Sequence, residues 1–470
     1  MKTYEVKIDG TACRVQKARV SAMPFNKVWN GAQRPLSQTE EAYFVTVDME
    51  HTINMEICVK EGFERYEIRP LSFDLSDKRV QNTVTLTIDQ PRHFTFEADG
   101  FHNALHVFIN PKSQKPALSS NTLYYGKGAH NAGLIWLKSN QTLYIEEGAV
   151  VYGVVYAKDA HNVTIAGRGV LDSSPYRRGN DIGEGGHSVI DALNAKGISE
   201  ADIKFTGNLV LHHCKNVTVE GIILKDAPLW ALITRNGCEN ITIDNVKIVG
   251  QWRYNADGID ICTSKNVIVK NCFVRSFDDC FVARGAYLDG EDGDVENVTV
   301  ENCVLWCDWG KSLEVWCGHK PTCIRNVTFQ NNYLIHLCNT AMNITTWYGS
   351  GRSIIQNITY ENIHIDPENE YRSEMLESEE NKSYVYQPGY RPWLIKISVE
   401  RLGRMAGLGT QKCEEVDDLS GFHLRYENIL FDRIICPDAS LPVRVKEKEG
   451  VLQINNVTAR NCKFKIEPEA

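Results

Sequence analysis

The sequence predicts an all-β protein with a β-sandwich over residues 1–115 and a solenoid of stacked coils over residues 116–470. Two observations lead to this prediction. In the first part, short apolar segments separated by turn residues recur about every ten residues, which is typical of a sandwich. In the second part, a phrase that begins with Asn returns at intervals that are mostly 24 to 31 residues, the period of a repeat protein.

Six strands are expected in the sandwich, and we expect them to pair in antiparallel fashion. They are Tyr4–Ile8, Ala42–Val47, Asn54–Val59, Tyr66–Ile68, Val84–Ile88 and Phe94–Ala98. His102 and His106 follow without a cysteine or acidic cluster beside them, so we interpret both as packed or surface residues rather than ligands. Asn110–Pro116 contains two prolines and two lysines and is interpreted as a linker.

In the solenoid, each repeated phrase continues from its Asn into β-branched residues. The phrases begin at Asn162, Asn216, Asn240, Asn266, Asn297, Asn326, Asn357, Asn428 and Asn456. One coil cannot bury its own apolar face, so neighbouring coils must stack into a common core. Asn suits the turn because it tolerates left-handed backbone angles and its amide can bond to its counterparts. Many of these residues also form Asn-x-Thr glycosylation triplets, but their spacing follows the coil, and we reject that interpretation.

Composition narrows the class of protein. A net charge of −9, with 43% apolar and 24% charged residues, gives no footprint for nucleic acid or an anionic membrane. No apolar run approaches the roughly 20 residues that span a bilayer, and the first residues lack a signal-peptide core, so we expect a cytoplasmic protein. Most of the 15 cysteines should then be reduced. Cys317 and Cys323 are spaced too loosely for zinc, and we expect neither metal nor cofactor; the oligomeric state stays open.

The stretch 255–285 carries the candidate chemistry. Asp257 precedes one short apolar segment, and the adjacent Asp278 and Asp279 precede the next, about 21 residues later. If that interval is one coil, the two segments are neighbouring strands roughly 4.8 Å apart, and the three carboxyls converge. Crowded carboxyls repel one another, which raises at least one pKa and keeps a proton available for acid–base catalysis. The alternative is that these acids cap turns or bind Ca²⁺.

NADGID at 255–260 followed by DDC at 278–280 resembles the polygalacturonases of glycoside hydrolase family 28 and the related dextranases and isopullulanases of family 49. A preceding sandwich and the passage Leu123–Gly153 are more similar to family 49. The resemblance implies a right-handed parallel β-helix, a pectin-lyase-like solenoid, that hydrolyses glycosidic bonds with inversion. It also implies that Asp278 is the general acid, while Asp257 and Asp279, both ionised, hold and activate water.

Two departures from family 28 bear on the substrate. Trp309 stands where the polygalacturonase motif has histidine, and Asn343 and Thr345 stand where its Arg-x-Lys motif grips a carboxylate. A site that binds a carboxylate needs a fixed cation. We therefore expect a neutral glycan, and the resemblance to dextranases implies an α-linked glucan. If Arg284, Arg253 or Lys311 from other coils binds a substrate carboxylate, a polygalacturonase-like activity stays open. A lyase and a non-catalytic carbohydrate-binding β-helix are further alternatives.

Aromatic and polar residues around the acids are candidates for sugar binding, because sugar rings stack on aromatic side chains. The expected substrate-binding residues are Trp252, Tyr254, Asn255, Arg284, Trp309, Lys311, Glu314, Trp316 and Trp347. About half of the aromatic side chains should instead fill the interior, since side chains alternate along a strand. Two polar interruptions of the repeat, at 176–187 and 366–420, are expected to line the site.

Overall fold

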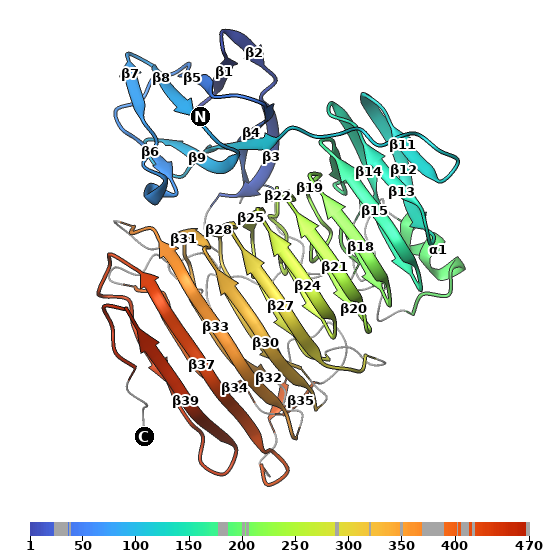
Figure 1. Ribbon diagram of the computed structural model, residues 1–470, viewed down its shortest axis with the longest axis vertical. Coiled ribbons are helices and arrows are strands. Elements are labelled where there is room, and N and C mark those ends of the chain that lie inside the picture. Colours follow the sequence, from blue (N-terminus) through green and yellow to red (C-terminus); the bar gives the residue numbers. More distant parts are fainter. Residues whose placement is uncertain are drawn as a thin grey trace.

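A computed structural model describes residues 1–22, 36, 39–176, 187–199, 203, 206–286, 291–318, 321–347, 351–368, 390–401, 403–405, 413–415 and 419–466. Within these residues the chain is almost entirely β-structure, with two five-stranded sheets followed by one continuously wound sheet of 27 strands (Figure 1). The predicted all-β architecture with a right-handed parallel β-helix is confirmed.

The two N-terminal sheets enclose a core that includes Val45, Ile57, Leu86, Phe96 and Val107. The first contains β2 (Thr11–Cys13), β1 (Tyr4–Ile8), β5 (Ile53–Val59), β8 (Thr83–Ile88) and β7 (Asp77–Val80). The second contains β3 (Gln16–Ser21), β4 (Thr39–Met49), β10 (Leu105–Pro111), β9 (Arg92–Ala98) and β6 (Tyr66–Arg69), with a 3-10 turn at Leu71–Phe73.

Each of the six expected strands of the first part lies on a strand of the structure, whereas β2, β3, β7 and β10 were not predicted. Two details differ from expectation. The pair β4–β10 is parallel, although the other sandwich pairs are antiparallel. The expected linker begins too early, because Asn110 and Pro111 still belong to β10 and the Asn110 side chain is buried.

In a full coil of the solenoid the chain forms three strands. Equivalent strands of successive coils pair in parallel, which gives three sheets, here called sheets I, II and III. Sheet I contains β12 (Gly128–Leu137), β14 (Ala149–Lys158), β17 (Leu209–His212), β20 (Leu232–Arg235), β23 (Ile259–Cys262), β26 (Phe281–Arg284), β29 (Lys311–Cys317), β32 (Thr340–Trp347), β34 (Trp393–Arg401) and β38 (Val443–Val445). It carries the candidate acids.

Sheet II contains the Asn phrases, and sheet III consists of short strands. Sheet II is β11 (Thr122–Tyr125), β13 (Thr142–Ile145), β15 (His161–Gly167), β18 (Lys215–Glu220), β21 (Glu239–Asp244), β24 (Lys265–Lys270), β27 (Val295–Glu301), β30 (Cys323–Gln330), β33 (Ile354–Ile365), β37 (Leu424–Ile435) and β39 (Leu452–Arg460). Sheet III is β16 (Val170–Asp172), β19 (Ile223–Lys225), β22 (Lys247–Val249), β25 (Phe273–Ser276), β28 (Val304–Cys307) and β31 (Tyr333–His336).

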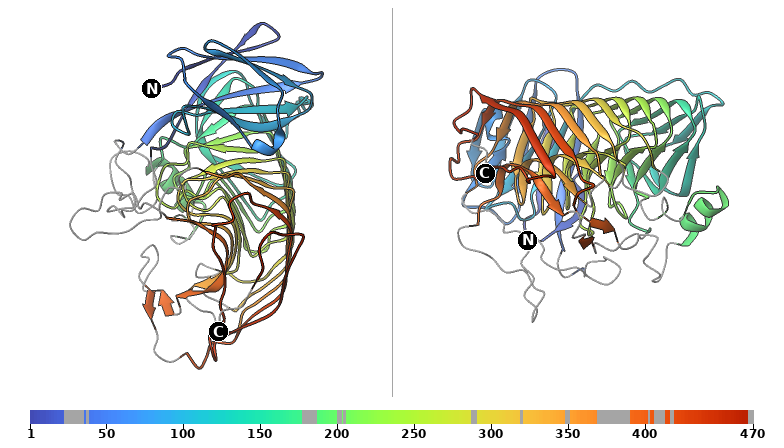
Figure 2. Two further views of the ribbon diagram at one scale, coloured as in Figure 1. Left: turned by 90° about the vertical axis from the view of Figure 1, so that its left-hand side faces the viewer. Right: turned by 90° about the horizontal axis from the view of Figure 1, so that it is seen from below.

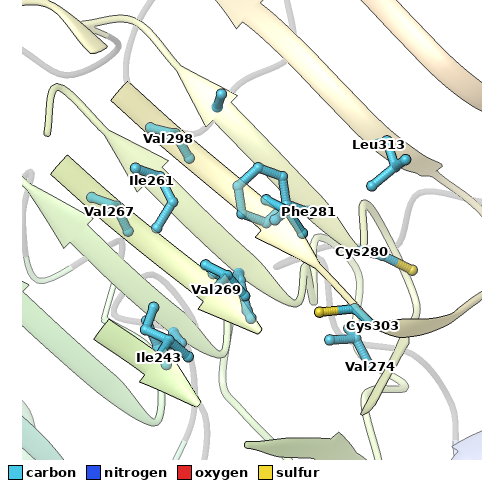
Figure 3. Packing of buried hydrophobic residues seen from close by; sticks show 14 of the residues in the cluster. Ile243, Ile261, Val267, Val269, Val274, Cys280, Phe281, Val298, Cys303 and Leu313 are labelled. Carbon is cyan, nitrogen blue, oxygen red and sulfur yellow. The ribbon is translucent and has the colours of Figure 1, made fainter. Parts of the chain in front are cut away.

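Inward side chains of the three sheets fill the coil interior. Figure 3 shows this packing around Phe281 of sheet I, which lies among Val267 and Val298 of sheet II and Val274 of sheet III. Aromatic residues also stack from coil to coil, with the ring of Tyr360 parallel to a neighbouring ring on either side at 4.8 and 5.0 Å. Removing a buried side chain of this size costs about 3–5 kcal/mol, so the repeated interior holds the register of every coil.

The predicted role of the repeated Asn residues is confirmed. All nine have a left-handed backbone, with φ between 54° and 58°. Each side-chain Nδ2 donates to the Oδ1 of the Asn one coil earlier, beginning with Asn162 to Asn140 at 3.0 Å and ending with Asn456 to Asn428 at 2.8 Å. The ladder lies along one edge of sheet II and fixes the stacking of the coils.

The N-terminal sheets pack against the outward face of sheet III (Figures 1 and 2). Phe44 and Phe108 meet Phe273 and Trp306 there. Buried polar contacts accompany them. Lys247 Nζ donates to Asn110 Oδ1 at 2.9 Å. Across the same boundary, a histidine ring is hydrogen-bonded to a carboxylate in the pair His336–Glu97 and to an amide oxygen in the pair His93–Asn245. Because sheet III is covered in this way, the outward face of sheet I is left for the candidate site.

Helix α1 (His187–Ala195) was not predicted. It lies at the N-terminal end of the solenoid (Figure 2) and covers the outward face of the first coils of sheet I, where Val189 and Leu193 pack on Tyr156, Val210 and Ile233. No helix in the described ranges is long and apolar enough to cross a membrane.

The two polar interruptions have different outcomes. Residues 177–186 of the first lie outside the described residues. The second was expected as one excursion over 366–420, but β34 within it is a regular strand of sheet I, so that part of the prediction is wrong. A short antiparallel pair, β35 (Gly403–Met405) and β36 (Cys413–Glu415), follows, and residues 369–389 are not described.

The cysteines belong mainly to the coil interior. Fourteen of them have described side chains, and none of these is in a disulfide. Of the ten from Cys214 to Cys338, nine are buried and Cys323 is half-buried. A buried thiol behaves as a small apolar side chain. Titration of denatured, unreduced protein stays the test of their predicted reduced state.

Candidate active site

The three aspartates lie side by side on neighbouring coils of sheet I. Asp257 directly precedes Gly258 and β23, and Asp278 and Asp279 directly precede Cys280 and β26. Gly258 N–H donates to the carbonyl oxygen of Asp279 at 2.8 Å, and Ile259 N–H donates to that of Cys280 at 3.0 Å. The two turns are therefore stacked, as the 21-residue interval predicted. The three residues are only 2%, 6% and 5% exposed, respectively.

Two further acids extend this group along the outward face. Asp260 on β23, Val282 on β26 and Glu314 on β29 are cross-strand partners, while their neighbours Ile259, Ile261, Leu313 and Val315 point into the core. Glu314 was expected near the site, but Asp260 was not. The alternation of Ile259, Asp260 and Ile261 places an acid outward on the same strand as Asp257, and this was the signal that could have found it.

Arg284 sits between two of these carboxyls. Its Nη2 donates to Asp257 Oδ2 at 3.2 Å and to Asp260 Oδ1 at 2.9 Å. The guanidinium group lies over the rings of Trp230 and Trp316, at 4.3 and 4.6 Å from their centroids. Two carboxyl groups and two aromatic rings thus contact the cation. Arg284 is therefore engaged within the site, and Trp316, which is buried, serves as its support.

Lys311 lies at the other side of the acids. Its backbone N–H donates to Asp279 Oδ1 at 2.8 Å, and its Nζ is 3.6 Å from both Asp279 Oδ1 and Glu314 Oε1. Asn343 on β32 donates from Nδ2 to Glu314 Oε1 at 2.8 Å. Asp279 and Glu314 are themselves hydrogen-bonded.

The adjacent pair Asp278 and Asp279 is split into an acid and a base. Burial, followed by the charge of Asp279, raises the pKa of Asp278 to about 8, although Lys311 and Asn255 oppose the rise. Burial also acts to raise the pKa of Asp279, but the charge of Lys311 and hydrogen bonds from Glu314 and the Lys311 N–H outweigh it and leave that pKa lowered. At neutral pH Asp278 holds a proton and Asp279 is ionised.

Asp257 differs from our expectation of an ionised group. Burial, then the charges of Asp260, Asp278 and Asp279, raise its pKa well above the ordinary value, and Arg284 only partly opposes them. Burial likewise raises the pKa of Asp260 to about 7. One guanidinium shared by two buried carboxyls cannot keep both ionised. The sequence could not show that the cation was shared.

Two residues fix the position of Asp278. Asn255 has a left-handed backbone and donates from Nδ2 to Asp278 Oδ2 at 3.1 Å. Gly310 on the next coil leaves the necessary space, because a Cβ there would lie 2.4 Å from Asp278 Oδ1 and 2.5 Å from Asp279 Oδ1. No other residue type fits at position 310 without displacing both carboxyls.

Among the expected aromatic platforms, Trp309 is placed best. Its ring stacks on Phe277 at 5.3 Å and 11° and meets Tyr254 at 5.5 Å. It is half-buried, whereas Tyr254 is buried. Trp309 Nε1 has no hydrogen-bond partner within the described part of the chain. Its ring therefore keeps both exposed surface and an unused donor.

The other two aromatic candidates are not brought to the acids in the same way. Trp252 is buried and donates from Nε1 to Asp226 Oδ1 at 2.9 Å, with Arg253 over its ring; we interpret it as a packing residue. Trp347 is the last residue of β32, but its side chain lies outside the described part. No cluster of three His, Cys, Asp or Glu residues suited to a metal ion is present in the described ranges.

The sequence profile of glycosyl hydrolases family 28 matches residues 130–371, more than half of the chain, and this range includes every acid described above. The chain belongs to glycosyl hydrolases family 28. A probable polygalacturonase of Arabidopsis thaliana is 28% identical over 134 residues, which is 23% of this chain and 29% of the plant protein. The match thus spans less than a third of that relative.

A solved structure extends the likeness in fold to 97% of this family 28 chain. Dex49A from Penicillium minioluteum superposes with a TM-score of 0.59 over 97% of this chain and 92% of that protein, at 15% sequence identity. A family 28 exopolygalacturonase from Yersinia enterocolitica is also similar, with a TM-score of 0.46 and 13% identity over 96% of this chain and 98% of that one. The expected resemblance is confirmed for family 28 by the sequence profile and for family 49 at the level of the fold.

Proposed function

We propose that this family 28 protein is an inverting glycoside hydrolase whose substrate is a neutral, α-linked glucan. The observation that supports hydrolysis most directly is the split pair, in which Asp278 is protonated and the adjacent Asp279 is ionised. Inverting hydrolysis needs this combination of one carboxylic acid and one carboxylate.

The residues then take distinct roles. Asp278 donates its proton to the glycosidic oxygen as the bond to the anomeric carbon breaks. Asp279 accepts a proton from a water molecule that attacks the opposite face of the sugar. Asp257 Oδ1 has no hydrogen-bond partner in the described part, so it is available to orient that water. Trp309 offers a ring for sugar stacking.

The neutral substrate is supported by the state of the nearby cations. Arg284 is paired with Asp257 and Asp260, and Lys311 lies between Asp279 and Glu314. Arg253, the third candidate, is paired with Asp226. Five acidic side chains surround two cations at the site, and a uronic acid would add another negative charge to this buried group. A hydroxyl-rich neutral sugar adds none.

A uronic-acid glycan is the second candidate. It is favoured by the name of the plant relative and by two cations farther along the same outward column, since Asn343 is followed by Lys396 and then Arg444. Both lie beyond Glu314 in the direction of the C-terminus, at two and three coils from it, and a carboxylate bound at that distance would meet them.

One product screen separates these candidates. Purified protein is incubated with dextran, isomalto-, nigero- and malto-oligosaccharides and polygalacturonate, and reducing ends, product masses and ultraviolet absorbance are recorded. We expect new reducing ends from a neutral α-glucan, with inverted anomeric configuration by NMR. Cleavage of polygalacturonate alone would support the second candidate, unsaturated products would indicate a lyase, and no cleavage would favour a binding protein.

A further inference from the structure

We propose that Glu314 is a positioning residue, which donates a hydrogen bond to Asp279 and so holds this base in place for its reaction with water. This inference deepens the proposed function and rests on it. It also replaces our expectation that Glu314 binds sugar hydroxyls directly.

The contacts of Glu314 define its protonation. Its Oε1 accepts from Asn343 Nδ2 at 2.8 Å and faces Lys311 Nζ at 3.6 Å, and the side chain is hydrogen-bonded to Asp279. Two ionised carboxylates have no donor between them. A proton must therefore reside on either Glu314 or Asp279.

The surroundings place that proton on Glu314. Asp279 Oδ1 already accepts the Lys311 backbone N–H at 2.8 Å and lies 3.6 Å from its ammonium group, and both contacts favour the charged form. Glu314 is 3% exposed, and its burial, followed by the charge of Asp279, raises its pKa well above the ordinary range. The protonated Glu314 then donates and the ionised Asp279 accepts.

Charged and titratable groups approach Glu314 from each packed element. Asp279 and Arg284 come from the preceding coil and Lys311 from its own strand. Beyond Asn343, Lys396 is the next charge in the outward column. Of these groups, Asp279 is the acceptor that requires a proton from Glu314. The hydrogen-bonded chain Asn343–Glu314–Asp279 thus spans the outward face of three consecutive coils.

This arrangement makes a specific prediction for the isosteric amide. In Glu314→Gln the amide NH₂ can donate to Asp279 while its oxygen still accepts from Asn343. We expect this variant to retain kcat and KM close to those of the unchanged enzyme, on whichever glycan the product screen identifies. A residue that worked as an ionised carboxylate or as a proton donor in the reaction would not tolerate Gln.

Glu314→Ala removes the donor altogether. We expect kcat/KM to fall by about 10- to 100-fold, the equivalent of one hydrogen bond to a charged group, with the loss in kcat rather than KM. The acidic limb of the pH profile should move to higher pH, because Asp279 loses a contact that favours its charged form. Loss of sugar binding would instead raise KM and leave that limb in place.

Glu301 provides a matched control. It is a half-buried glutamate at the end of β27 on sheet II, where its carboxylate accepts from Gln330 Nε2 at 2.6 Å. Glu301→Gln and Glu301→Ala should leave kcat, KM and the pH profile unchanged. Melting temperatures of all four variants show whether a loss of turnover follows from unfolding.

A spectroscopic test needs no substrate. The infrared difference between the unchanged protein and Glu314→Gln at pH 7 should contain the carbonyl band of a protonated carboxylic acid. Carboxylate bands in its place would overturn the proposal, as would a Glu314→Gln enzyme as impaired as Glu314→Ala. If no glycan is cleaved, the proposed function fails while this band still decides the protonation of Glu314.

Discussion

Two halves of one column on sheet I carry opposite kinds of side chain. In the first coils, Tyr156, Val210 and Ile233 are consecutive outward partners, and α1 covers them. The next partner in the same column is Asp260, and Val282 and Glu314 follow it. Polar and basic residues then continue the column toward the C-terminus. Register is unbroken between the halves. The outward side chain alone therefore changes the surface from a packing face into a candidate catalytic one.

The inward column beside it shows no such change. Leu209, Leu232, Ile259, Phe281 and Leu313 are consecutive partners and all belong to the same core. The stacked coils therefore fix where each side chain lies. Outward positions can carry reactive side chains without any change in the packing of the interior. Substitutions in the two halves should consequently fail in different ways, the polar half in turnover and the covered half in folding.

The largest effect is expected in the polar half, for Asp278→Asn. This change keeps the shape of the side chain and removes the acid, so turnover should fall by about 10²–10⁴-fold, the usual contribution of a general acid. Circular dichroism and melting should show an intact fold. Asp279→Asn should lower turnover comparably, and the double variant should not multiply the losses, because the two residues act as a unit. Near-normal turnover of Asp278→Asn would contradict the assignment.

In the covered half, Ile233→Asp places an acid one coil before Asp260. Apolar residues of α1 and the sheet surround this position, so the carboxyl either ionises at a high energetic cost or stays protonated without solvent. We expect the free energy of unfolding to fall by about 3–5 kcal/mol, as for an uncompensated buried charge. Ile233→Val is the control and should cost about 0.5–1.5 kcal/mol. Urea denaturation measures both, and equal losses would show that α1 does not exclude water.

A substitution at Gly310 tests how closely the acids of the polar half are packed against the next coil. Gly310→Ala directs a Cβ toward both Asp278 and Asp279, and a displacement of about 1 Å at reacting groups costs roughly 10²-fold in rate. The exposed Gly10 has no atom within 4 Å of its added Cβ, although its positive φ adds some strain, so Gly10→Ala is the comparison that separates backbone effects from the collision. A Gly310→Ala enzyme with unchanged kcat would mean that the carboxyls are free to move.

Sequence periodicity predicted the parts of the molecule that repeat. The Asn ladder and the stacking of Asp257 against the Asp278–Asp279 pair both follow from intervals of one coil. Sheet III could not be predicted because its strands, some only three residues long such as Val170–Asp172, are too short to show alternation. Nor does alternation tell what covers an outward residue, and for that reason the burial of Trp316 against Arg284 and the cover provided by α1 were missed.

The pH dependence of turnover follows from the split pair. Activity should fall as pH rises through about 8, since Asp278 then loses the proton it must donate. It should also fall at acidic pH as Asp279 becomes protonated, at a pH below the ordinary range for aspartate because its pKa is lowered. Each limb changes the rate by about tenfold per pH unit beyond its pKa. A rate that stays constant up to pH 10 would exclude Asp278 as the acid.

The last expected effect is on stability, and it links the two halves. The pKa of Asp278 is raised from 3.8 to about 8 on folding, so between those values the folded state binds more protons than the unfolded one. Stability from this group is then present below about pH 4 and is lost as pH rises toward 8. Asp278→Asn removes the titrating group.

We therefore expect the melting temperature of Asp278→Asn to exceed that of the unchanged protein at pH 7–8. The difference should vanish near pH 4. Val210→Ala in the covered half gives the comparison, because its loss of stability should be the same at every pH. Melting curves of the three proteins across this range decide the matter. A pH-independent difference for Asp278→Asn would mean that its carboxyl is not held protonated, and the polar half would then lack its acid.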